Sequence, residues 1–168
     1  MTRIFNIILS IIILQMTFVA CNTNKPRQSD SAAATETVEE LTSELHALKE
    51  QYRLNDSITL KFTVHNPTRQ ELRFTEYGTP FEKFLGKYLI IIDENGNEVD
   101  YSGPMARRVM PPPAETYHYL GADQSETVEF SIQDVYKFTK AGNYAIQYRG
   151  ERINAIKSSN VISITIME

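Results

Sequence analysis

An alternation of apolar and polar side chains over residues 57–64 constrains the fold of this chain more than any other feature. The apolar positions are Ile58, Leu60, Phe62 and Val64, and polar residues separate them. Successive side chains of a β-strand point to opposite faces, so the pattern predicts a strand with one buried and one solvated face.

The same kind of pattern returns along the rest of the chain, with turn signals between the repeats. Further strands are predicted near 72–75, 87–93, 98–101, 128–132, 144–148 and 161–166. Asn66-Pro67 marks one turn, and Asn95-Gly96 marks a hairpin because Asn-Gly tolerates positive φ. About eight short strands with little helix predict an antiparallel β-sandwich that forms one domain over residues 41–168.

The first segment of this domain is ambiguous. Its apolar residues recur every three or four positions, at Val38, Leu41, Leu45, Leu48 and Tyr52. This spacing favours a short amphipathic helix. The alternative is an edge strand over residues 42–48 that opens the sandwich.

Gly142-Asn143-Tyr144 precedes a predicted strand and matches a tyrosine corner. In that motif a tyrosine hydroxyl bonds to backbone slightly upstream and fixes a crossover between sheets. The alternative is a turn glycine before an aromatic strand residue. Either interpretation concerns stability and carries no chemistry.

The N-terminus has the pattern of a bacterial lipoprotein signal. Arg3 precedes an apolar run over residues 4–20, and Ala20 stands before Cys21, the only cysteine of the chain. Acylation of the Cys21 thiol and cleavage before it would attach the mature chain to a lipid bilayer. We therefore expect a signal peptide over 1–20 and a protein of the bacterial cell envelope, either periplasmic or surface-facing.

A plain signal peptide and a transmembrane helix are the alternatives. The apolar run contains Asn6, Ser10 and Gln15 and falls short of the roughly 20 apolar residues that a spanning helix needs. Residues 21–40 are polar and without aromatics, which predicts a flexible tether after the lipidated cysteine.

Charge and motif content narrow the classes of function. The chain has a formal net charge of −4, and its only basic cluster is Arg107-Arg108, so nucleic acid is not an expected partner. Three histidines, His46, His65 and His118, show no zinc-ligand spacing, and no nucleophile or phosphate-loop motif occurs. The sequence thus predicts no cofactor, no metal and no catalytic residue.

A resemblance to a known family runs from Phe74 to Tyr148. The matching segments are Thr79-Pro80-Phe81, residues 95–103, Arg107-Arg108, residues 115–120, Ser125, residues 132–138 and Gly142-Asn143-Tyr144. In their order and spacing they resemble the N-terminal propeptide domain of deuterolysin-type zinc endopeptidases. The chain is also similar to small bacterial proteinase-inhibitor sandwiches.

The resemblance implies an immunoglobulin-like module of about seven or eight strands, and it favours a strand over residues 42–48. In the resembling family a zinc peptidase domain follows the module, but no such domain stands before Glu168. We therefore expect the role of a prosegment, which is contact with a protease or a folding partner, rather than proteolysis.

The expected contact surface is the connection over residues 102–113, with Arg107, Arg108 and Met110. Its prolines stiffen the backbone, and paired arginines and methionines suit protein interfaces. The alternative is a solvated crossover between the sheets. Phe81 is a second candidate anchor, although loop aromatics often fold back onto the core.

Two kinds of function remain open. The first is a membrane-anchored, non-catalytic protein-binding module, such as a protease inhibitor or a prosegment-like chaperone, with a secreted protease as its partner. The second is a structural or adhesive envelope lipoprotein with no protease connection. The pattern indicates no oligomeric state.

Overall fold

The computed structural model describes residues 40–151 and 153–168. The predicted signal peptide, Cys21 and the tether up to residue 39 lie outside the described residues. Within the described ranges, no helix has the length and apolar character needed to cross a membrane.

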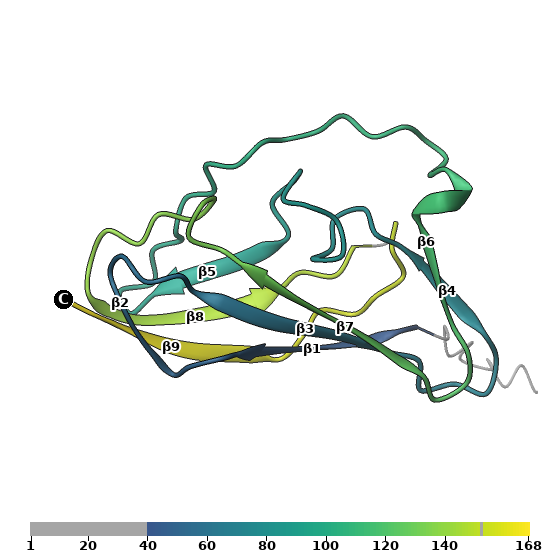
Figure 1. The fold of residues 1–168 in the computed structure, drawn as a ribbon, viewed down its shortest axis with the longest axis horizontal. Coiled ribbons are helices and arrows are strands. Elements are labelled where there is room, and N and C mark those ends of the chain that lie inside the picture. Colours follow the sequence, from purple (N-terminus) through teal and green to yellow (C-terminus); the bar gives the residue numbers. More distant parts are fainter. Residues whose placement is uncertain (1–39, 152) are drawn as a thin grey trace, which may run out of the picture. The chain divides into compact units, whose positions relative to one another are not determined.

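Two sheets pack face to face in the domain (Figure 1). The first has the antiparallel order β1 (Thr42–Ala47), β3 (Thr59–His65), β7 (Ser125–Ser131). The second has the order β2 (Gln51–Arg53), β9 (Val161–Met167), β8 (Gly142–Tyr148), β5 (Leu89–Asp93). A separate antiparallel pair joins β4 (Leu72–Thr75) to β6 (Tyr117–Leu120), and a 3-10 turn (Ala114–Thr116) precedes β6.

The strand order is that of an immunoglobulin-like sandwich. The first sheet combines the first, third and seventh strands, so the chain crosses between sheets repeatedly instead of forming successive hairpins. The short β2 pairs in parallel with the last strand β9, whereas β5, β8 and β9 pair antiparallel. The predicted all-β, immunoglobulin-like fold is confirmed.

The alternating pattern over residues 57–64 becomes the central strand of the first sheet. Leu60, Phe62 and Val64 are fully buried, and the polar residues between them face outward. Across the core, the Phe62 ring lies 4.6 Å from the Tyr148 ring of the second sheet, centroid to centroid. Each such fully buried apolar side chain contributes about 1.5–3 kcal/mol, which makes this inter-sheet layer the main source of stability.

The first segment of the domain, which the sequence left ambiguous, is the strand β1. The strand favoured by the family resemblance is confirmed, and the helix favoured by the spacing of apolar residues is wrong. Leu41 and Leu45 are buried, while Leu48 is 51% exposed. Residues four apart share a face in a helix and also in a strand, so two of the leucines fit both patterns. The Asn160 side chain further holds the strand by bonding to both backbone groups of Leu45.

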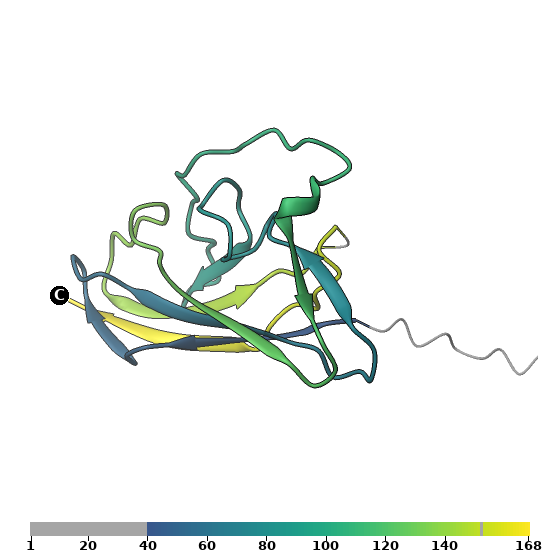
Figure 2. The ribbon, with the colours of Figure 1, turned by 45° about the vertical axis from the view of Figure 1, so that its right-hand side comes forward.

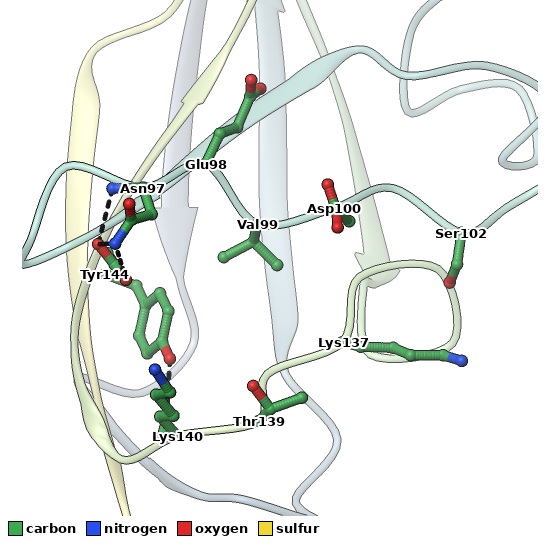
Figure 3. Close-up of a pocket in the computed structure, with 10 residues that line it drawn as sticks. Asn97, Glu98, Val99, Asp100, Ser102, Lys137, Thr139, Lys140 and Tyr144 are labelled. Carbon is green, nitrogen blue, oxygen red and sulfur yellow. Dashed lines mark hydrogen bonds between the residues drawn. The ribbon is translucent and has the colours of Figure 1, made fainter.

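The tyrosine corner is confirmed. The Tyr144 hydroxyl donates to the Lys140 carbonyl over 2.8 Å, four residues upstream (Figure 3). Gly142 begins the strand with a φ of 150°, and a Cβ there would touch the Glu94 carboxylate. The phenol therefore fixes the entry of β8 into the second sheet.

The predicted Asn-Gly turn forms, but the strand expected after it does not. Gly96 has a φ of 84°, and its N–H donates to the Asp93 carbonyl over 3.0 Å. Beyond the turn, the pairing is limited to an isolated bridge between Ile92 and Glu98, with one hydrogen bond from Asp93 to Asn97 and one from Val99 to Ile91. The chain then leaves the sheet edge and enters the long connection toward β6.

Candidate protein-contact site

The long connection over residues 102–113, called the strap below, lies apart from the sheets. It follows β5 and its turn, arcs above the sandwich in both ribbon views, and ends at the 3-10 turn (Figures 1 and 2). No strand or helix is assigned within it. Its position is set by a few specific contacts.

The start of the strap is pinned to the sandwich. Ser102 donates its backbone N–H to the Val135 carbonyl over 2.8 Å, and the Tyr101 hydroxyl donates to the Pro104 carbonyl over 2.8 Å. Gly103 lies between these bonds, where a Cβ would come within 2.5 Å of the Tyr101 hydroxyl oxygen. Any larger residue here would have to displace the Tyr101 ring or the Val135 side chain.

Arg108 braces the middle of the strap. Its guanidinium pairs with the Glu82 carboxylate, donates to the Leu85 carbonyl over 3.3 Å and lies 4.9 Å from the centroid of the Tyr77 ring. The Ala106 N–H donates to the same Leu85 carbonyl over 2.8 Å. Two strap residues, one on each side of Arg107, are thus fixed to the loop that follows β4.

The Glu82–Arg108 pair is largely enclosed. The side chains of Glu82 and Arg108 are 8% and 20% exposed. Burial raises the pKa of the Glu82 carboxyl above its usual value, and the neighbouring Arg108 charge opposes this rise. Because loss of either partner would leave a buried charge uncompensated, the pair favours a single position of the strap.

The outer side of the strap carries large apolar side chains. Met105, Val109 and Met110 are 73%, 66% and 60% exposed. Arg107 is exposed among them and forms no ion pair with any residue that the structure describes. At the far end, Pro113 has φ −59° and ψ 151°, the polyproline II region, which stiffens the approach to β6.

The structure separates the four predicted contact residues. Arg107 and Met110 face solvent, whereas Arg108 turns inward to Glu82. Phe81 folds back into an aromatic cluster, 5.2 Å from the Phe74 ring and 5.0 Å from the His118 ring. The strap therefore brings together Arg107 and Met110, while Phe81 lies in the loop beneath it.

Sequence reasoning missed two residues of this site. Val109 stands beside Met110 without a motif of its own, and Glu82 lies 26 residues before its partner Arg108. An ion pair between residues so far apart in the sequence produces no short-range sequence pattern that could predict it. Only the placement of the loop after β4 under the strap reveals it.

Two clefts adjoin these elements. One, of about 340 Å³, lies under the strap between Ala106, Arg108 and Arg149. The other, of about 430 Å³, lies beside the tyrosine corner, with Glu98 and Lys137 among its lining residues (Figure 3). Both clefts mix acidic and basic groups.

The histidines lie far from one another in the sequence and have separate partners. His46 approaches Glu44, His65 approaches Ser125, and His118 approaches Glu126. Across residues 40–151 and 153–168, no three His, Cys, Asp or Glu side chains are grouped to hold a metal ion.

Part of this chain is similar in sequence to part of a known protease. No protein-family model matches the chain. Over 93 residues the chain is 27% identical to an extracellular protease of Aeromonas hydrophila, a match that covers 55% of this chain and 26% of the protease. The chain thus spans about a quarter of that relative, and the deuterolysin prosegment family stays a prediction.

Two solved structures are similar to this chain at low identity and low TM-score. The CARDB domain of a Pyrococcus furiosus protein, solved with di-metal ions, has a TM-score of 0.39 at 12% identity and covers 76% of this chain and 88% of that one. A mutant β-glucosidase from Listeria innocua, solved with laminaribiose, has a TM-score of 0.40 at 11% identity, with 77% and 16% covered.

Proposed function

We propose that this chain is a lipid-anchored protein of the bacterial cell envelope that binds a secreted protease and is not itself a catalyst. The observation that carries the proposal is the strap. Three large apolar side chains and Arg107, which has no ion-pair partner among the described residues, project from a segment braced at its start and middle. Methionine and arginine are enriched in protein interfaces, and bracing lowers the entropic cost of binding.

The similarity to part of an extracellular protease supports the choice of partner. A module similar to part of a protease can act in trans as a prosegment does, by blocking the enzyme or by assisting its folding. Such a module needs a contact surface and no catalytic residue. The strap supplies the surface.

The anchor rests on Cys21 and the apolar run before it. We expect Cys21→Ser to abolish incorporation of labelled fatty acid and to leave the protein either released or with an uncleaved signal. The measurement is metabolic labelling with radioactive palmitate, followed by fractionation of the envelope. Equal labelling of the serine variant would contradict the anchor.

The partner is tested by recovery of activity. The full chain, immobilised through its C-terminus, is incubated with the secreted proteins of the source cells, and the bound fraction is dissociated and assayed for endopeptidase activity. Activity should be recovered with the wild type and lost with Val109→Ser/Met110→Ser. The matched control is Leu48→Ser, since Leu48 is 51% exposed at the end of β1 and outside the strap.

Equal recovery with the strap variant and the wild type would contradict the strap as the contact surface. Recovery of envelope proteins without any endopeptidase activity would favour the alternative, a structural or adhesive lipoprotein.

A further inference from the structure

The middle of the strap is anchored on both sides of the exposed Arg107. The Ala106 N–H and the Arg108 side chain are held against the Leu85 carbonyl and Glu82, whereas Arg107 and Val109 face solvent. Arg107 therefore projects from a short segment whose two flanking residues are fixed to the loop between β4 and β5.

The main chain at the outer side of the strap is free. Among the described residues, the N–H and C=O groups of residues 107–110 make no hydrogen bond. A peptide with free main-chain groups is recognised when these groups pair with a strand of the partner and its side chains enter pockets. The uncovered main chain of residues 107–110 is available for such pairing.

We propose that the strap enters the substrate cleft of an endopeptidase, with the Arg107 side chain in a specificity pocket that carries a carboxylate. This proposal rests on the protease-binding function proposed above. Arg107 is the outward cation between the apolar Met105 and Val109, and it has no partner charge among the described residues. A carboxylate-bearing pocket is the environment that a guanidinium pairs with best.

The Glu82–Arg108 pair explains how such a segment would block an enzyme without being rapidly consumed. The bond that the enzyme would cut is the peptide bond between Arg107 and Arg108. The Arg108 side chain on its far side contacts Glu82, Leu85 and Tyr77. After a cut at that bond, the new ends would stay beside each other because these contacts hold one side and the Ala106–Leu85 bond holds the other. The cut segment would remain in the cleft.

The test uses two probe enzymes that differ in the specificity pocket. Trypsin has a carboxylate in this pocket and chymotrypsin has an apolar slot. The full chain is titrated into each enzyme while hydrolysis of a small fluorogenic peptide is followed. We expect competitive inhibition of trypsin at least about tenfold stronger than that of chymotrypsin, and a loss of about thirtyfold or more in Arg107→Ala.

Two further variants define the result. Arg107→Leu should shift the preference toward chymotrypsin, and Arg69→Ala, an exposed arginine in the β3–β4 turn, should leave inhibition unchanged. Rapid cleavage of the strap by trypsin without inhibition would overturn the proposal, as would equal inhibition by wild type and Arg107→Ala.

The proposed function and this inference fail in different ways. If the protease activity recovered by the full chain still hydrolyses the small peptide while bound, the chain binds the enzyme but does not fill its cleft, and only the inference is wrong. If the full chain recovers no protease activity, the proposed function itself is wrong.

Discussion

The sandwich and the strap are held in place by opposite means. The sandwich buries its large apolar side chains between two sheets, with Phe62, Leu60 and Tyr148 fully enclosed. The strap exposes its large apolar side chains and is positioned by one ion pair and a few backbone hydrogen bonds. Changes in the sandwich should therefore alter stability, and changes on the outer side of the strap should alter binding alone.

The largest effect should come from the inter-sheet layer. Phe62→Ala removes a ring that contacts Tyr148 and Phe81, and we expect a loss of about 3–5 kcal/mol in the free energy of unfolding. Urea denaturation followed by circular dichroism measures this loss. Phe62→Leu is the matched control and should cost clearly less. A loss below about 1 kcal/mol for the alanine variant would mean that the layer does not hold the domain.

The brace between the two regions should give the next effect. Glu82→Ala and Arg108→Ala should each cost about 1–2 kcal/mol, less than the roughly 3–5 kcal/mol of a fully buried pair because Arg108 keeps 20% of its side chain exposed. The double variant should cost less than the sum of the two, since each single change leaves a charge without its partner. Additive losses would contradict the coupling.

This pair also has a pH signature. Without Arg108, the pKa of the Glu82 carboxyl should rise further, because the opposing charge is gone. A carboxyl with a raised folded-state pKa supports folding below its ordinary value of 4.5, and this support is lost as the pH rises through the folded-state pKa. The loss in Arg108→Ala should accordingly be larger at pH 7 than at pH 4.

The tyrosine corner offers a smaller test within the sandwich. Tyr144→Phe removes only the hydroxyl that donates to the Lys140 carbonyl, and we expect a loss of roughly 1 kcal/mol. Inhibition and protease recovery should not change, because the corner lies outside the strap. An unchanged denaturation midpoint would show that the hydrogen bond adds no net stability.

The smallest effect concerns the turn that leads to the strap. Hydrogen bonds from the side chain and backbone of Asn97 hold the pKa of the exposed Asp93 carboxyl below its usual value of 3.8. The turn is therefore supported above that value and loses this support as the pH falls through the lowered pKa. An NMR titration of Asp93 that gives an ordinary pKa would contradict the bonding.

The regular strands could be predicted from the sequence because apolar and polar residues alternate along each of them. Phe62 and its neighbours specify one face locally, and Gly142-Asn143-Tyr144 specifies a corner through three adjacent residues. The first strand was ambiguous because Leu41 and Leu45 satisfy two periods at once. The short β2 and β6 carry too few residues for a pattern to stand out.

The site could be predicted only in part. The prolines and the arginine pair drew attention to residues 102–113, but the sequence did not separate the directions of Arg107 and Arg108. That separation depends on Glu82, which reaches Arg108 only after the sandwich has placed the loop between β4 and β5 beneath the strap. Long-range electrostatic pairing has no period, so sequence pattern alone cannot supply it.

The enclosed tyrosines give the domain a built-in optical probe. The chain has no tryptophan, and burial raises the pKa of the phenols of Tyr88, Tyr136 and Tyr148 well above their ordinary 10.0. In alkaline solution these phenols stay neutral while the fold lasts, and the folded state loses their support as the pH climbs beyond 10. Their phenolate absorbance should therefore appear abruptly as the sandwich opens, which reports unfolding without any label.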